Sequence, residues 1–253
     1  MATPRFTARF LISCAAVFTT AAFARAETVF YSAGHGDIRI EVFDDDGGPQ
    51  LRPFFHFDNT AILDGERVPA PLDLAAATVL TSVPHSATLF VDAPWLGRSA
   101  GDTVNLIEAG QRPGSPFLGF GAENLSPSDW SGPLTLSLVG MRAPEGENVA
   151  IWQFQFQGVF TAWESVGGIE NSAAVPIPAG GHDHFNLGFT APGIYELDLV
   201  ASGNHTTLGN LTGPPTTLTF VVAVPEPGTV ALLALGSIGV VIFHRRRMTR
   251  ARR

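Results

Sequence analysis

The chain has 253 residues, of which 45% are hydrophobic and 15% charged, and its formal net charge at pH 7 is −8. It contains no lysine, and nine of its 15 arginines lie in the first 26 and the last 31 residues. Residues 27–222 therefore carry six arginines against 22 acidic residues, a net charge of −16. Such an acidic region repels nucleic acid and anionic lipid and attracts cations, so we expect no nucleic-acid partner.

The first 26 residues have the three parts of a secretory signal peptide. Arg5 and Arg9 form a basic start, residues 10–23 are mostly apolar, and Ala24-Arg25-Ala26 has the small-x-small pattern of a cleavage site. We predict cleavage after Ala26, with Ala24 and Ala26 as the small residues that are recognised. A lipoprotein-like box ending at Cys14 is the alternative. This cysteine is the only one in the chain, so the exported domain is predicted to lack disulfides.

Residues 27–222 are punctuated by glycine and proline, and the segments between them are short. Several alternate apolar with polar residues, which is typical of strands with one buried face. The clearest are residues 38–42, 135–139, 151–157, 195–200 and 217–222. The best helical candidate is residues 71–80. We predict an all-β fold, a single antiparallel β-sandwich or jelly-roll-like domain over residues 27–222.

One turn in this domain has a clear local explanation. Ala191-Pro192-Gly193 fits a type II turn, with proline at its second position and glycine where φ is positive. The flanking aromatic residues, Phe189 and Tyr195, are then expected to pack against each other across a hairpin.

Three pairs of potential metal ligands stand two residues apart in the central region: His35 and Asp37, His56 and Asp58, and His182 and His184. Residues i and i+2 of a strand point to the same face about 6–7 Å apart, so both can reach one ion. Imidazole with carboxylate suits zinc and other divalent first-row metals, whereas the lack of thiolates disfavours copper(I). We predict His35, Asp37, His182 and His184 as zinc ligands, with His56 as the next candidate. Each pair also fits an ordinary strand or turn.

The C-terminal residues 223–253 read as a sorting signal. Pro225-Glu226-Pro227 precedes an apolar stretch, residues 229–243, and an arginine-rich end. The apolar stretch is near the short limit for a membrane-spanning helix, and the arginines favour a cytoplasmic end. This order of parts closely resembles the PEP-CTERM sorting signal of Gram-negative bacteria. The resemblance implies membrane attachment through this helix, recognition by an exosortase, and delivery to the cell envelope, cell surface or extracellular matrix. A plain single-pass anchor is the alternative.

A second resemblance covers both ends of the central domain. Gly34-His35-Gly36-Asp37-Ile38 and the segment 181–195, which begins Gly181-His182-Asp183-His184-Phe185, resemble the actinobacterial surface-anchored (choice-of-anchor M type) domain and zinc-repressor-regulated PEP-CTERM proteins. Leu187 departs from the pattern, which often has an aromatic residue there. The resemblance implies expression under zinc limitation, zinc capture at the surface, and components of a metal-uptake transporter as partners.

Enzyme signatures are absent from the sequence, so we expect no catalytic activity. It has no nucleophile elbow, phosphate loop or His-Glu-x-x-His helix, and no acidic residue stands four positions after His184, where cupin enzymes need a glutamate. The rival hypothesis is a non-catalytic exopolysaccharide-binding or structural matrix protein. It depends on four tryptophans that could stack on sugars, Trp95, Trp130, Trp152 and Trp163. Of these, Trp130 is expected to be exposed and Trp152 to pack in the core.

Overall fold

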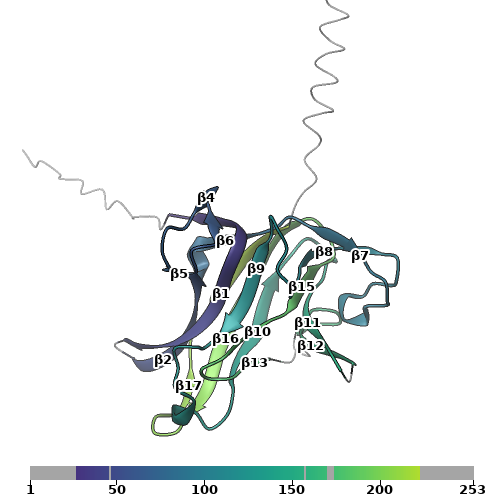
Figure 1. The fold of residues 1–253 in the computed structure, drawn as a ribbon. Helices are drawn as coiled ribbons and strands as arrows, with labels where there is room; N and C mark the ends of the chain where they lie inside the picture. The colour runs from purple at the N-terminus through teal and green to yellow at the C-terminus, as the bar shows by residue number, and fades with distance from the viewer. Residues whose placement is uncertain (1–26, 46, 157, 170–173, 223–253) are drawn as a thin grey trace, which may run out of the picture.

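The computed structural model describes residues 27–45, 47–156, 158–169 and 174–222, which fold almost entirely into β-strands (Figure 1). No helix among these residues is long and apolar enough to cross a membrane. The predicted signal peptide with Ala24 and Ala26, the Pro225-Glu226-Pro227 motif and the predicted apolar helix 229–243 lie outside the described residues.

The strands form two sheets. The larger sheet contains β1 (Val29–Asp45), β2 (Gly48–Phe57), β3 (Ile62–Leu63), β4 (Glu66–Arg67), β5 (Leu72–Ala75), β6 (Val79–Val83), β9 (Pro116–Gly121), β10 (Leu134–Arg142), β13 (Val175–Ile177), β14 (His182–His184), β16 (Gly193–His205), β17 (Gly209–Thr212) and β18 (Thr216–Val222). The smaller sheet contains β7 (Ser86–Thr88), β8 (Thr103–Ile107), β11 (Val149–Gln155), β12 (Gly158–Glu164) and β15 (Asn186–Phe189). The 3-10 helices that lie wholly within the described residues are η1 (Ala76–Thr78), η2 (Pro94–Leu96) and η3 (Pro127–Asp129).

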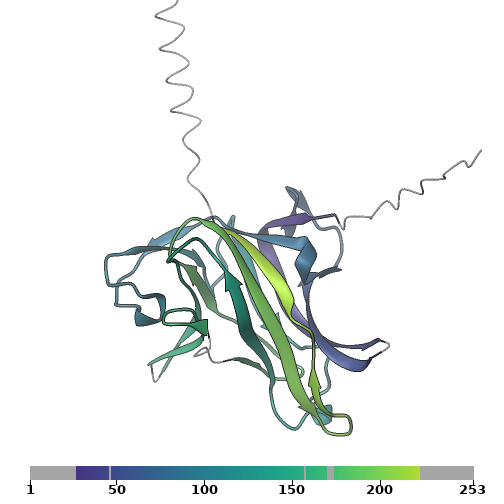
Figure 2. The same cartoon turned by 180° about the vertical axis from the view of Figure 1, so that it is seen from behind.

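The two sheets pack face to face around a main apolar core, with a smaller apolar cluster that includes Leu96 and Trp152, which confirms the prediction of an all-β sandwich. The larger sheet runs β13-β10-β16-β18-β6-β1-β2-β5, and seen from behind, β10, β16 and β18 lie side by side (Figure 2). The ring of Phe189 on β15 lies 5.3 Å from that of Phe220 on β18 and 4.8 Å from that of Tyr195 on β16. The alternation read from the sequence produces this core, since Tyr195, Leu197 and Leu199 are fully buried.

The sheet is mixed, so the prediction of a purely antiparallel sandwich is wrong. β1 pairs in parallel with both β6 and β9, and β18 pairs in parallel with β6. The cause is the length of β1: residues 29–31 pair with β6, while residues 34–39 pair with β9. Both partners follow β1 only after long connections, and a long connection lets a strand return in the same direction.

Two local predictions also fail. Residues 71–80 form β5, η1 and the start of β6 in place of a helix. Phe189 and Tyr195 do pack together, but their strands β15 and β16 belong to different sheets, so Ala191-Pro192-Gly193 crosses between sheets and closes no hairpin. The Tyr195 hydroxyl donates a hydrogen bond to the Ala191 carbonyl at 3.0 Å, which fixes this crossing.

Candidate metal site

The candidate ligands lie on three neighbouring strands, β1, β9 and β14, with β9 in the middle. Asp37 on β1 and His184 on β14 are both in register with Gly119 of β9. His182 is likewise in register with Gly121. Because facing residues of neighbouring strands project to the same side, Asp37 and the two β14 histidines share one face of the sheet. Ile38 and Ile40 project to the other face and are fully buried in the core.

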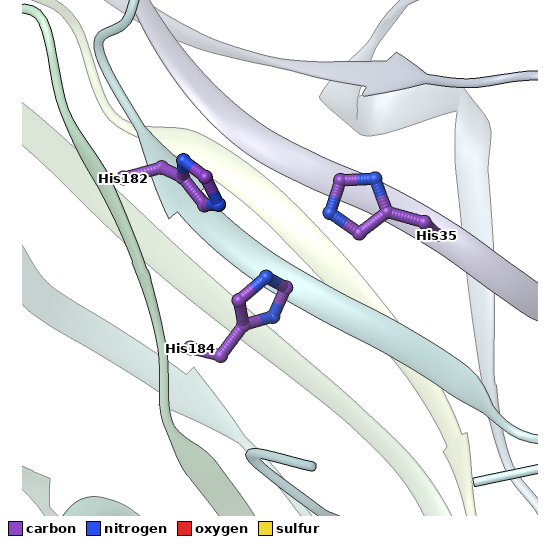
Figure 3. Close-up of side chains that lie close together, drawn as sticks. All are labelled: His35, His182 and His184. Carbon is purple, nitrogen blue, oxygen red and sulfur yellow. The ribbon is translucent and has the colours of Figure 1, made fainter. Parts of the chain in front are cut away.

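Three imidazoles meet on this face: His35, His182 and His184, which we call the histidine trio. One potential ligand atom from each lies within 4.8 Å of the other two, and Figure 3 shows each ring turning a nitrogen toward its neighbours. A tetrahedral zinc ion with Zn–N bonds of about 2.0–2.1 Å needs nitrogens about 3.4 Å apart. The trio is therefore close to a binding geometry, and small movements of the rings are needed to complete it.

Asp37 adds a carboxylate beside the trio. It is only 2% exposed, its Oδ1 lies 3.4 Å from His35 Nε2, and this oxygen accepts no hydrogen bond of good geometry from the described residues. A buried carboxylate oxygen without a donor is costly unless a cation neutralises it. The middle strand leaves room for this oxygen, because a Cβ added to Gly119 would lie 2.0 Å from it and 3.1 Å from His184 Cε1. The residues present thus fit a divalent cation.

Two local features position β1 and β14. Gly34 has a φ of +82°, and a Cβ there would lie 2.1 Å from the carbonyl oxygen of Thr60, so glycine allows β1 to approach the segment after β2 just before His35. On the other side, the Gln153 amide of β11 donates to Asp183 Oδ1 at 2.9 Å and to the His184 carbonyl at 3.3 Å. These bonds hold the outer edge of the short strand β14.

Further carboxylates contact the trio from outside. His35 Nδ1 lies 3.2 Å from Asp58 Oδ2, and His182 Nδ1 lies 3.4 Å from Glu123 Oε1. The ring of His184 instead stacks on Phe117, with centroids 3.8 Å apart and an angle of 2°. The sequence pattern had paired Asp58 with His56 and gave no signal for Glu123 or Phe117, because each meets its histidine only through strand pairing.

The environment moves the pKa values of His35 and His184 in opposite directions. The nearby Asp37 carboxylate raises the pKa of His35 and outweighs the opposite effect of burial. Burial lowers the pKa of His184, and the Leu118 carbonyl and Asp37 offset this only in part. For Asp37, burial acts to raise the pKa, but His35, His182 and His184 together bring it below its usual range. These shifts favour the neutral imidazole at His184 and the protonated imidazole at His35.

His56 lies on the same face but outside the trio. It is in register with Asp37, yet its Nδ1 contacts Asp73 Oδ1 on β5 at 2.5 Å, on the side away from the trio.

Of the four tryptophans, Trp130, Trp152 and Trp163 are buried, so the prediction that Trp130 is exposed is wrong and the prediction that Trp152 packs in the core is confirmed. Trp130 lines part of a groove of about 590 Å³ with Phe160, Phe185 and Gln153.

The C-terminal end of the chain matches a motif of known proteins. Residues 223–247 match the model of the PEP-CTERM protein-sorting motif, which confirms the predicted sorting signal. The motif marks a bacterial protein that is exported, recognised by an exosortase and sorted to the cell surface. No curated protein and no solved structure matches the chain, so the resemblance of residues 34–38 and 181–195 to zinc-related surface proteins stays a prediction.

Proposed function

We propose that this exported, surface-sorted protein binds a divalent metal ion, most favourably zinc, through His35, His182, His184 and Asp37. The observation that carries the proposal is the convergence of three imidazoles from β1 and β14 over a glycine of the strand between them, beside the buried Asp37 Oδ1, which has no hydrogen-bond donor among the described residues. Burying a carboxylate costs free energy because it loses its hydrogen bonds to water, and a neighbouring cation offsets this cost.

The donor set favours zinc over other biological cations. Three nitrogens and one oxygen suit Zn²⁺ in a tetrahedral site, whereas Ca²⁺ and Mg²⁺ prefer six or more oxygens. Copper(II) and nickel(II) also bind imidazole but favour square-planar or tetragonal arrangements. The net charge of −16 on residues 27–222 raises the local concentration of any cation and so supports capture without selecting among metals.

The position of the site is consistent with metal as cargo. His182 keeps 44% of its side chain exposed, so an ion can enter and leave on that side. A surface-sorted protein with such a site fits metal capture at the envelope of a Gram-negative cell, with delivery to components of a metal-uptake transporter. Tail removal by the exosortase would release the domain into the extracellular matrix.

Calorimetry with zinc on the purified full-length chain in detergent tests the proposal. We expect binding of one ion per chain in the native protein, and loss of that binding when His182 and His184 are both replaced by alanine. His56→Ala is the matched control, because it removes an imidazole from the same face outside the trio. Binding that is equally weak in all three proteins, as on a generic acidic surface, would refute a metal site.

A neutral polysaccharide is the second candidate ligand, and the groove beside Trp130 is the observation that favours it. Phe160 is partly exposed and supplies an apolar face there, and Gln153 and Gln155 supply amides that can bond hydroxyl groups. Polysaccharide binding that is unaffected by chelator but abolished by Phe160→Ala would support this candidate over the metal.

A further inference from the structure

We propose that Asp58 and Glu123 are positioning residues that hold His35 and His182 in the tautomer that presents Nε2 to the metal. This inference rests on the proposed metal site and extends it to two carboxylates outside the ligand set. Both approach the nitrogen on the far side of the ring from the centre of the trio. A carboxylate at that nitrogen fixes the ring orientation and makes the other nitrogen a stronger ligand.

Asp58 is itself fixed in place. Its Oδ1 accepts hydrogen bonds of 2.6 Å from both the backbone N–H and the hydroxyl of Thr60, which leaves Oδ2 facing His35 Nδ1 at 3.2 Å. The Thr60 hydroxyl oxygen also accepts the backbone N–H of His35 at 3.0 Å. Backbone and ring of His35 are therefore both tied to the segment after β2. The other ring nitrogen, Nε2, faces Asp37.

Glu123 is arranged in the same way from the opposite side. Its Oε2 accepts a hydrogen bond from Arg39 Nε at 3.1 Å, and its Oε1 lies 3.4 Å from His182 Nδ1. Arg39 belongs to β1, so this contact joins β1 to β14 over β9. Gly121 leaves the space for it, since a Cβ there would lie 2.4 Å from Glu123 Oε2.

The third imidazole, His184, is oriented without a carboxylate. Its ring is held by parallel stacking on Phe117, and no carboxylate of the described residues pairs with its Nδ1. The three ligands are thus oriented by three different contacts. Removing Asp58 should affect His35 alone, and removing Glu123 should affect His182 alone.

The test is zinc calorimetry on the full-length chain with Asp58→Asn, Glu123→Gln and the two combined. A carboxylate that bonds to the free nitrogen of a metal-binding histidine typically contributes about 10–100-fold in metal affinity, so we expect about a 10-fold or greater loss from each single change. Because both rings would hold the same ion, the two losses are coupled, and the double variant should bind zinc more weakly than either single variant. Glu145→Gln is the control for charge, since Glu145 is an exposed glutamate between β10 and β11, and neither strand pairs with β1, β9 or β14.

A double-mutant cycle separates positioning from general electrostatics. Asp58→Asn should weaken zinc binding in the native background but leave the residual affinity of His35→Ala unchanged. Nitrogen NMR of the zinc-loaded chain should show a protonated Nδ1 on His35 that is lost or exchange-broadened in Asp58→Asn. Native-like affinity and ring signals in both single variants would overturn the inference while leaving the metal site intact. A native chain that does not bind zinc would overturn both.

Discussion

The substitution Gly119→Ala tests the site where the middle strand, β9, lies closest to Asp37. The added Cβ would lie 2.0 Å from Asp37 Oδ1, and real Cβ atoms essentially never come within 3.0 Å of a neighbour, so Oδ1 must move by at least 1.0 Å. Metal–ligand distances tolerate only about ±0.2 Å. Asp37 would lose its place as a ligand, and His184, with Cε1 3.1 Å from the new atom, would be pushed as well.

The expected size of the effect follows from this displacement. Loss of an outer-shell partner alone costs about 10–100-fold in metal affinity, so displacing an inner carboxylate should cost at least about 100-fold, or about 2.7 kcal/mol. Zinc calorimetry measures this directly. Gly110→Ala is the matched control, because that glycine has no atom within 4 Å of an added Cβ. A Gly119→Ala protein that folds and binds zinc as tightly as the native chain would refute the geometry argued here.

Three further outcomes are expected. Zinc affinity should rise with pH up to the raised pKa of His35 and level off above it, because the ion must displace that proton, and zinc titrations at several pH values measure this. The His35–Asp37 pair should stabilise the metal-free protein in the opposite sense: fully below the ordinary histidine pKa of about 6.5, and less and less as pH rises through the raised value, which thermal melts measure. His184→Ala should weaken zinc binding by at least about 100-fold in calorimetry, whereas an equal loss in His56→Ala would show that the trio is not the site. Replacing Pro225-Glu226-Pro227 with alanines should leave the protein unprocessed in the membrane fraction, and normal surface delivery in a fractionation assay would contradict the role of the motif.

The sequence predicted the all-β class of fold because the alternation of apolar and polar residues is a property of each short segment. Alternation in segments such as residues 195–200 places every second side chain in the core, and β16 confirms it. The parallel pairing of β1 with β9 is not local, since residues some 80 positions apart must meet, and no single segment records its partner. Purely antiparallel pairing was therefore the wrong extrapolation from correct strands.

The same distinction applies to the site. The spacing of His182 and His184 predicted that both would share a face, and the structure places both in the trio with His35. What lies between them could not be predicted, because Gly119 and Gly121 read as ordinary glycines until β9 is known to be the middle strand. Asp58 was assigned to its sequence neighbour His56, but the chain turns after β2 and brings its carboxylate to His35.

The relation of the site to the core decides whether the metal is structural. The trio and Asp37 lie on the outer face of β1, β9 and β14, while β1 and β9 bury Ile38, Leu118 and Phe120 in the core. The fold therefore has its own apolar support and should survive metal removal, unlike a zinc finger. Zinc at about 100 times its dissociation constant should add only the mass-action stabilisation of about 2.7 kcal/mol. For a domain of this size that is a rise of about 5–10 °C in Tm, which thermal melts with and without chelator measure. A chelated protein without a cooperative transition would show that the ion holds the fold together, and capture as cargo would then be the wrong account.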